Sequence, residues 1–330
     1  MSPSHIVLED TRILAELCGA NDYNLSVISS LLGTPVRSRG NELSIDSEDR
    51  GVGELFSKLV SAIGVSIEDG MPATPELIIA LHAELTPEGD RSTNARYNGE
   101  QPRSDEVLKF LDTCVQIPNG FGKVFPRSSG QSLYLQGIMA HDLSFAVGPA
   151  GTGKTFLAMA YALREILSRS RRKLVLTRPV VEAGESLGFL PGDLEQKINP
   201  YLRPLYDAME ALVPYETIHR LEESRAIEVA PLAYMRGRSL TNCIVILDEG
   251  QNTTKEQMKM FLTRLGEHTK AIVTGDITQI DLPKKTESGL VHAVNLLENI
   301  DDVFVSRLDA RDVVRSSLVR KIIEAYEKEQ

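Results

Sequence analysis

The stretch GPAGTGKT, near the middle of the 330-residue chain, combines glycines with a lysine and a threonine at fixed spacing. The pattern G-x-x-x-x-G-K-[ST] turns successive backbone N–H groups toward an anion, and the helix that follows adds its partial positive charge. The lysine of such a loop reaches the β and γ phosphates of a nucleotide, and the threonine hydroxyl binds Mg²⁺. The predicted phosphate-binding residues are Gly148, Pro149, Ala150, Gly151, Thr152, Gly153, Lys154 and Thr155.

The flanking residues place this loop between a strand and a helix. The apolar run LSFAV, 143–147, predicts a buried strand, and apolar residues from Phe156 to Leu167 recur at helical spacing. This context argues against a glycine-rich turn that binds nothing. The loop alone does not separate hydrolases from small-molecule kinases or signalling GTPases.

Two adjacent acids end another apolar run, CIVILDEGQNTT, 243–254. Asp248 can hold the Mg²⁺ shell, and Glu249 can orient and deprotonate an attacking water. The alternative is that the acids begin the next helix, where 252–254 also supply natural caps. A water-activating glutamate favours hydrolysis over transfer to a metabolite, and the sequence has no NKxD element for reading guanine.

A further strand, AIVTGD, leads into ITQIDLP. This order places Asp276 and Gln279 at the carboxyl edge of a sheet, where α/β proteins form ligand sites. Gln279 is suited to sense the γ phosphate, the alternative being a polar loop residue.

The elements that must position these side chains lie within residues 105–330. Short β-branched runs alternate there with helical patterns: LSFAV, KLVLT, CIVILD, KAIVTG and DVFVS. This alternation predicts an α/β domain, a parallel sheet sandwiched by helices.

Residues 1–85 predict a separate small α+β domain, and 86–104, rich in Pro, Gly, Asn and charge, predict a flexible linker. HIVL predicts a short strand, and helical spacing covers 10–18 and 23–32. Alternation around Gly40-Asn41 predicts two strands, and a last helix fits 50–63.

The order β-α-α-β-β-α resembles a KH-type RNA-binding domain. The GxxG loop that clamps a nucleic-acid backbone in that family would lie between the first two helices. This chain has GANDYN there, with Asp22 where a phosphate would approach. RNA binding and a docking or assembly role both stay open for this domain.

Charge is uneven along the chain, whose net charge is −10. Residues 1–104 hold 8 lysines and arginines against 16 acids, and the remainder holds 28 against 30. An acidic first third disfavours non-specific nucleic-acid binding there, so a polynucleotide partner is expected to meet the second part.

The sequence predicts a cytoplasmic protein without zinc. No apolar run approaches the ~20 residues that span a bilayer, and the start lacks the order of a signal peptide. The three cysteines are widely spaced and form no CxxC pair, so they are interpreted as small apolar core residues.

Seven long motifs, in this order along the chain, resemble the PhoH-like ATPases. The resemblance covers nearly all of 126–330, and residues 1–70 resemble the N-terminal domain of the long members. It implies a P-loop NTPase core of RecA or helicase type, similar to superfamily 1 helicases, with ATP hydrolysis and an RNA role. The motifs are PRSSGQSLYLQ, HDLSFAVGPAGTGKT, LTRPVVEAGESLGFLPGDLEQKINPYLRPLYDAM, EVAPLAYMRGRSL, ILDEGQNTTKEQMKMFLTRLG, VTGDITQIDLP and DVVRSSLV.

Further roles follow from the resemblance by position. Gln131 matches the glutamine that reads adenine in the helicase-like pattern, and Arg178 lies in the LTRP element after the second core strand. Gln279 matches the third helicase-like motif. Arg315 of DVVR is a candidate arginine finger, with a surface helix arginine as the alternative.

Two positions depart from the family pattern. Gly250 stands where the family usually has Ala, a change expected to preserve the loop. Ser316 stands where DVVRH would give His, which removes a hydrogen bond or charge beside Arg315.

Residues 178–240 are longer than a plain strand-to-helix connection, and functional loops are commonly this long. Their basic and aromatic residues could bind single-stranded RNA or build a subunit interface. These residues are Arg178, Lys197, Arg203, Arg236, Arg238, Tyr201, Tyr206 and Tyr234.

The sequence therefore predicts an Mg²⁺-dependent ATPase coupled to single-stranded RNA. A homo-oligomer, for which a ring is one arrangement, is expected, in which Arg315 completes a neighbour's site. Two alternatives stay open, a nucleotide-gated RNA-binding adaptor with little turnover and a kinase. The predicted catalytic residues are Lys154, Glu249, Gln279 and Arg315, and the predicted metal ligands are Thr155 and Asp248.

Overall fold

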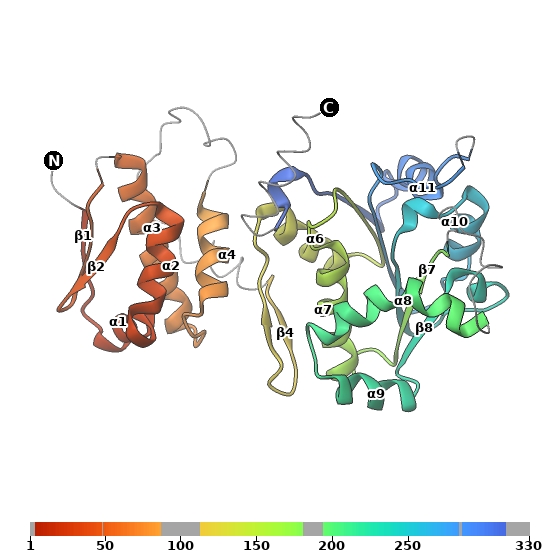
Figure 1. Ribbon diagram of the computed structural model, residues 1–330, viewed down its shortest axis with the longest axis horizontal. Coiled ribbons are helices and arrows are strands. Elements are labelled where there is room, and N and C mark those ends of the chain that lie inside the picture. The colour runs from red at the N-terminus through yellow and green to blue at the C-terminus, as the bar shows by residue number, and fades with distance from the viewer. Residues whose placement is uncertain (1–3, 48, 87–112, 181–193, 284–285, 315–330) are drawn as a thin grey trace. The chain divides into compact units, whose positions relative to one another are not determined.

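The computed structural model describes residues 4–47, 49–86, 113–180, 194–283 and 286–314 (Figure 1). The chain divides into two compact units, Met1–Cys114 with Phe125–Ser129, and Val115–Val124 with Gly130–Gln330. All of the predicted linker except Thr86 lies outside the described residues, so its flexibility and the domain boundaries stay predictions.

The N-terminal unit is a three-stranded antiparallel sheet packed on helices, with strand order β1-β3-β2. Its first six main elements have the predicted order β-α-α-β-β-α, and a fourth helix follows. The KH likeness stays a prediction. The elements are β1 (Ser4–Val7), α1 (Thr11–Cys18), α2 (Tyr23–Leu32), β2 (Val36–Arg39), β3 (Glu42–Ile45), α3 (Arg50–Glu68) and α4 (Pro75–Leu85).

Two helices of this unit differ from the prediction, one in its length and the other in its presence. Helix α3 continues past the predicted end at 63 because Ser66 and Ile67 extend its buried face. Helix α4 begins with Pro75, whose missing N–H costs nothing in the first turn, and the Thr74 side chain accepts a hydrogen bond from the Leu77 N–H. The sequence analysis did not predict this helix.

The second unit is built on a six-stranded parallel sheet of order β11-β6-β10-β9-β7-β8. All five predicted strands are present. Strand β8 was not predicted, because five residues ending in a proline lie inside the presumed insert. The strands are β6 (Leu143–Val147), β7 (Lys173–Arg178), β8 (Ile227–Pro231), β9 (Cys243–Leu247), β10 (Lys270–Gly275) and β11 (Val303–Arg307).

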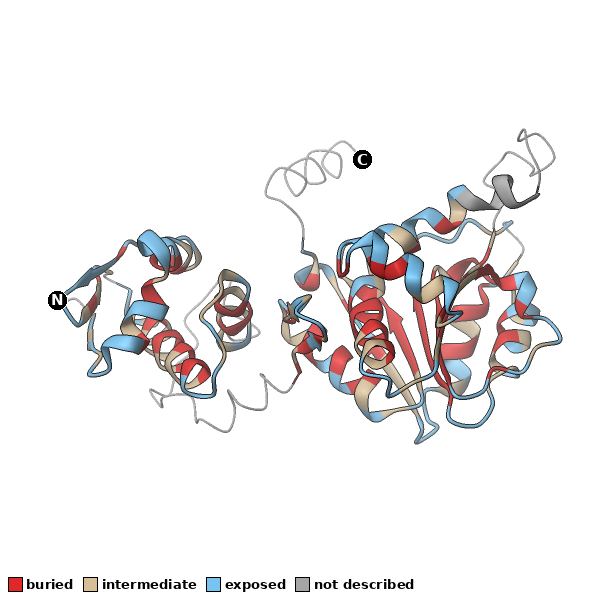
Figure 2. Cartoon of the chain, turned by 90° about the horizontal axis from the view of Figure 1, so that it is seen from below, coloured by how far each residue is buried: buried red, intermediate tan, exposed pale blue. Residues whose placement is uncertain are grey.

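Helices cover both faces of this sheet, as predicted, and alternate strand residues serve the two sides. Ile244 and Ile246 of β9 belong to the apolar cluster that contains α6, α7, α8 and α9, while Val245 and Leu247 belong to the cluster that contains α10 and α11. Figure 2 shows the sheet and the inner helix faces as buried. The helices are α6 (Ser129–Ala140), α7 (Lys154–Leu167), α8 (Leu194–Glu210), α9 (Tyr215–Glu223), α10 (Lys255–Leu262) and α11 (Gly289–Leu297), and a hairpin of β4 (Val115–Ile117) and β5 (Gly122–Val124) precedes them.

The parallel register brings the carboxyl ends of neighbouring strands to one edge. Gly275 pairs with Val147, and Thr177 pairs with Leu247. The loops after β6, β7, β9 and β10 therefore leave the sheet side by side, which positions the candidate site.

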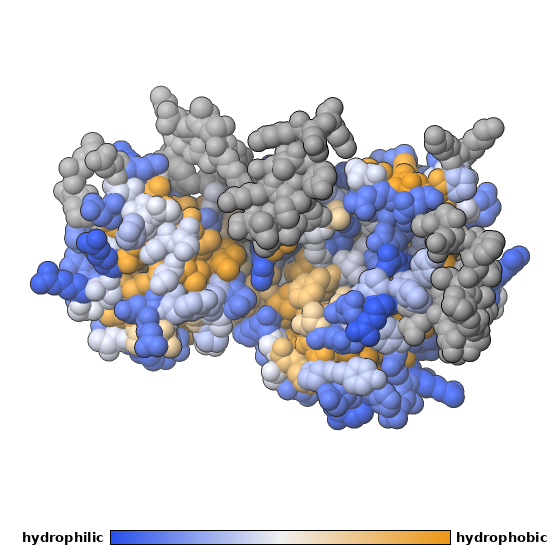
Figure 3. Space-filling view, in the orientation of Figure 1, coloured by the Kyte–Doolittle hydropathy of each residue, from blue (hydrophilic) through white to orange (hydrophobic). Residues whose placement is uncertain are grey.

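Polar and apolar residues are mixed on the visible faces of both units (Figure 3). Among the described residues, no helix is both long and apolar enough to cross a bilayer.

Candidate active site

The loop after β6 has the backbone that the glycine pattern predicts. Gly151 and Gly153 lie in the left-handed region, with φ of 83° and 78°, and Gly153 caps the N-terminus of α7. A Cβ on Gly148 would lie 2.5 Å from the Leu308 carbonyl oxygen. Glycine at these three positions lets the chain turn sharply from strand to helix.

Lys154 is anchored inside this loop. Its side chain is buried, and Nζ donates hydrogen bonds to the carbonyl oxygens of Gly148 at 2.6 Å and Pro149 at 2.7 Å. Thr152 Oγ1 accepts a longer one at 3.3 Å. The ammonium group is thus held against the backbone of the loop.

Burial lowers the pKa of Lys154, and three nearby carboxylates, Asp276, Asp248 and Glu249, oppose this shift. The cation therefore faces a set of acids across the carboxyl edge. The nearby negative charge makes burial of the Lys154 ammonium group tolerable.

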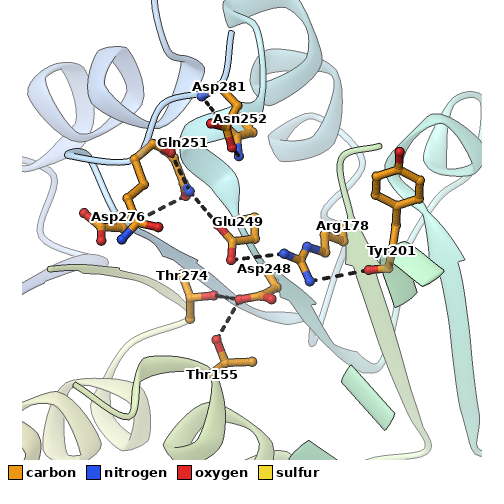
Figure 4. Close-up of polar contacts among 11 residues, drawn as sticks. Thr155, Arg178, Tyr201, Asp248, Glu249, Gln251, Asn252, Thr274, Asp276 and Asp281 are labelled. Atoms are coloured by element: carbon orange, nitrogen blue, oxygen red, sulfur yellow. Dashed lines mark hydrogen bonds and ion pairs between the residues drawn. The ribbon is translucent and has the colours of Figure 1, made fainter. Parts of the chain in front are cut away.

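Asp248 joins three elements through one oxygen. Oδ1 accepts a hydrogen bond from Thr155 Oγ1 at 2.6 Å and from Thr274 Oγ1 at 2.7 Å, and the side chain is buried (Figure 4). Thr155 opens α7 and Thr274 belongs to β10. The hydroxyl and carboxylate oxygens of Thr155 and Asp248 are hard donors of the kind that Mg²⁺ prefers.

These two residues do not form a closed protein cage for a metal. Within the described part of the chain, no three His, Cys, Asp or Glu residues gather in a way that could hold a metal ion. A pair of oxygen ligands suits Mg²⁺, which usually takes its remaining ligands from phosphates and water.

Glu249 is held by two neighbours and by an unusual backbone. Its φ is 54°, in the left-handed region, a conformation that non-glycine residues adopt at a cost and that clusters at functional sites. Arg178 Nη2 lies 3.1 Å from Oε1, and Gln251 Nε2 donates to Oε2 at 2.5 Å. The side chain therefore has a defined orientation.

The acids take no part in capping helix α10. Helix α10 begins at Lys255, and its capping box is formed by Thr254 and Gln257. Glu249 is the N-cap residue of the short 3-10 helix Gly250–Asn252, but its side chain makes no capping hydrogen bond there.

Asp276 and Gln279 follow β10 at the predicted edge. Asp276 is buried, and its Oδ1 accepts hydrogen bonds from the Thr278 N–H at 2.9 Å and hydroxyl at 2.6 Å. Its Oδ2 is buried and has no hydrogen-bond partner among the described residues. The Gln279 side chain is exposed, and the Gln279 backbone carbonyl oxygen accepts a hydrogen bond from Gln251 Nε2 at 3.1 Å.

Gln251 was not predicted as a site residue. It is almost fully buried, donates to Glu249 and Gln279, and accepts the Asp276 N–H through Oε1 at 3.0 Å. One side chain thus joins the acid pair to the loop after β10. The available signal was its place two residues after the acids, in the same strand-end segment DEGQN.

Of the two residues assigned by position from the family resemblance, the structure describes Gln131 and not Arg315. Gln131 is buried on α6, and Nε2 donates to the Thr152 carbonyl oxygen at 3.0 Å, so this side chain supports the phosphate loop. Its role in reading adenine stays a prediction. Arg315 and Ser316 lie outside the described residues; Val314 donates its N–H to the Gly151 carbonyl oxygen at 2.9 Å.

Gly250 fits tightly between strand and helix. A Cβ at this position would lie 2.9 Å from Val273 Cγ1 and 3.6 Å from Met258 Cε. Gly250, which departs from the pattern of the resemblance, therefore lies where the loop packs closely on β10.

Acids pair with many of the basic and aromatic candidates in 178–240. Arg203 contacts Asp207 and Glu210, as Arg178 contacts Glu249. Tyr234 is 53% exposed, and Arg236 is exposed as well. The remaining pairs are Arg238 with Glu228 and the Tyr206 hydroxyl with Glu222, and the Lys197 side chain and residues 181–193 are outside the described set.

The parallel sheet, the phosphate loop after β6 and the acids after β9 define a P-loop NTPase fold. The family model described as "PhoH-like protein" matches residues 123–327. The chain belongs to the PhoH-like family.

Known proteins of the same description match almost the whole chain. It is 45% identical over 315 residues to a PhoH-like protein of Mycobacterium leprae, covering 95% of this chain and 85% of that one. It is 44% identical over 309 residues to a PhoH-like protein of Bacillus subtilis, covering 93% and 89%. The crystal structure of the Pif1 helicase from Candida albicans aligns with a TM-score of 0.33 and 14% sequence identity. The alignment covers 60% of this chain and 42% of the helicase chain, and the family assignment does not depend on it.

Proposed function

We propose that this protein is an Mg²⁺-dependent ATPase whose turnover is coupled to RNA binding or remodelling. The observation that supports this most strongly is the 2.6 Å hydrogen bond between Thr155 and Asp248, with Glu249 as the next residue. A metal-binding pair beneath the phosphate loop and a held carboxylate beside it are the parts that hydrolysis needs.

In this proposal each residue acts on a defined atom. The loop N–H groups and Lys154 bind the β and γ phosphates, and Thr155 and Asp248 would hold Mg²⁺. The metal, when bound, neutralises charge that develops on the phosphate oxygens. Glu249 orients a water and accepts its proton, while Gln279 senses the γ phosphate.

Arg315 is proposed to contribute a positive charge to a neighbour's site in a homo-oligomer. Arginine supplied in this way stabilises the charge of phosphoryl-transfer transition states. The cytoplasm is the proposed location.

The RNA part of the proposal rests on a short segment after β8. Tyr234 and Arg236 are exposed there, and no acid contacts either side chain within the described residues. Because β8 pairs in parallel with β7, with Pro231 opposite Arg178, this segment leaves the sheet at the same edge as the acid pair. An exposed aromatic ring and a guanidinium group are suited to base stacking and phosphate contact.

The test measures phosphate release from ATP with Mg²⁺ or with a chelator, with and without single-stranded RNA, on protein of known mass in solution. We expect metal-dependent release that RNA increases. Tyr234→Ala and Arg236→Ala should lose the increase and keep the basal rate, whereas Tyr215→Ala, an equally exposed tyrosine on α9, should keep both.

Each contradictory outcome removes a different part of the proposal. No release from wild-type protein would overturn the ATPase assignment. Phosphate transferred to a small molecule would indicate a kinase. Release that RNA leaves unchanged, with RNA retained only when ATP is bound, would indicate the adaptor.

A further inference from the structure

We infer that Arg178 is a positioning residue that fixes the orientation of the Glu249 carboxylate. The inference rests on the proposed role of Glu249 as the base. Arg178 lies in a motif noted from the sequence, but no role in the reaction follows from that motif.

The strand register brings Arg178 to this place. It is the last residue of β7, the neighbour of β9, and the Thr177 carbonyl oxygen accepts the Asp248 N–H at 2.9 Å. The side chain leaves the strand end beside the acid pair. It is only 20% exposed, so its conformation is restricted by its surroundings.

Two contacts hold the guanidinium group from opposite sides. Nη2 lies 3.1 Å from Glu249 Oε1, and Nη1 donates to the Tyr201 carbonyl oxygen at 3.4 Å (Figure 4). Tyr201 belongs to α8, so Arg178 bridges from the helix to the carboxylate. The planar fork of arginine suits this arrangement because its nitrogens point in fixed directions, whereas a lysine offers one compact ammonium group.

The exposure of Glu249 explains why its carboxylate needs fixed hydrogen-bond donors. Glu249 is 35% exposed, and a carboxylate on a flexible side chain has several rotamers available in solvent. Arg178 engages Oε1 and Gln251 engages Oε2. An ionised carboxylate offers about four lone-pair positions, so two donors fix its plane and leave positions for a water.

A base displaced by an ångström loses much of its effect, on the order of 100-fold in rate. Removing the Arg178 side chain should therefore lower kcat and leave ATP binding intact. Among the described residues, Arg178 makes no contact with the phosphate loop. The effect should exist only while Glu249 can act as a base.

The experiment measures kcat and KM for phosphate release without RNA, in full-length protein, for Arg178→Gln and Arg178→Lys. Both substitutions are also made together with Glu249→Gln. Arg220→Ala, at an exposed arginine of α9, is the matched control. Circular dichroism melting shows that each variant is folded, and the lysine variant keeps the test valid if the glutamine variant is unstable.

We expect kcat of Arg178→Gln to fall about 10- to 100-fold with KM within about twofold, and Arg178→Lys to recover part of the rate. In the Glu249→Gln background neither change should lower the rate further, because residues that act as a unit are not additive.

A normal kcat in Arg178→Gln together with a slow Glu249→Gln would overturn this inference and leave the proposed function intact. A raised KM, or a further loss in the Glu249→Gln background, would show a structural role and also overturn it. An unchanged rate in Glu249→Gln alone would instead remove the proposed function.

Discussion

The two units of this protein bury polar side chains in different ways. In the described residues 4–86, Asn24 and Ser66 are the buried polar residues, and both bond to backbone carbonyl groups. The second unit buries Lys154, Asp248 and Asp276 at one edge of its sheet. In the first unit the buried polar groups complete the core. In the second unit the buried charged groups gather at the sheet edge where the candidate site lies.

Both units bury polar atoms that have no hydrogen-bond partner among the described residues, Glu54 Oε2 in the first unit and several atoms in the second. Asp276 Oδ2 and Thr177 Oγ1 are buried at that edge without a partner among the described residues. An unsatisfied buried polar group costs about 1–3 kcal/mol. Proteins that keep such groups usually keep them for a function, which fits a site that binds phosphate and metal.

The largest expected effect comes from Lys154→Ala. Its Nζ is held by the loop carbonyl groups of Gly148 and Pro149, and its charge faces the three carboxylates. Loss of this cation should weaken ATP binding at least ~10-fold and lower turnover ~100-fold or more, because electrostatic stabilisation of the phosphates is lost. Equilibrium binding of a fluorescent ATP analogue and phosphate release measure the two effects. Lys259→Ala, on the exposed face of α10, should change neither.

The next effect, Asn24→Ala, should appear in stability and leave the reaction unchanged. Asn24 Nδ2 donates to the carbonyl oxygens of Glu16 at 3.1 Å and Ala73 at 2.7 Å. Removing it takes the donor away from two partly buried carbonyl oxygens, so we expect the free energy of unfolding of the N-terminal unit to fall by about 1–3 kcal/mol. Urea denaturation measures this loss, with Ser30→Ala on the exposed face of α2 as the control. A large fall in ATP turnover at temperatures where the variant is folded would contradict the contrast between the units.

The smallest effect concerns an ion triad away from the acid pair. The hydrogen bonds from Arg238, opposed by burial and reinforced by Lys173, lower the pKa of Glu228 to about 2. A carboxylate with a lowered folded pKa stabilises the fold above its ordinary pKa of about 4.5, and this stability is lost as the pH falls toward 2. Because the side chain is 30% exposed, Glu228→Gln should cost only about 1 kcal/mol near neutral pH.

Urea denaturation at neutral pH and near pH 3 checks this prediction. The difference between wild type and Glu228→Gln should shrink at the lower pH. Glu223→Gln, at an exposed glutamate on α9, should change the free energy of unfolding little at either pH. A difference that grows as the pH falls would contradict the assigned cause.

The fold was largely predictable because its elements are strongly patterned. Each of the five predicted strands is a short apolar run, and the glycine loop fixes where a strand ends and a helix begins. Strand β8 and helix α4 were missed, and each has a proline at one end, the last residue of β8 and the first residue of α4. The register of β8 on β7 is a tertiary contact that local pattern does not contain.

The placement of the candidate residues was predictable where they share one segment. The loop and the acids lie in contiguous motifs, so residue types and spacing were sufficient to expect them after β6 and β9, and their roles stay predictions. Gln251 and Thr274 act through contacts with residues more than 20 positions away, and only the sheet brings them together. Arg178 was noted from its motif, but its contact with Glu249 depends on the pairing of β7 with β9.

The most direct test compares ATP affinity with turnover in Glu249→Gln. A carboxamide keeps the size of the side chain and cannot accept the proton of the attacking water. We predict ATP affinity within a few-fold of wild type and phosphate release at least ~100-fold slower. Wild-type turnover in this variant would contradict the account of the site.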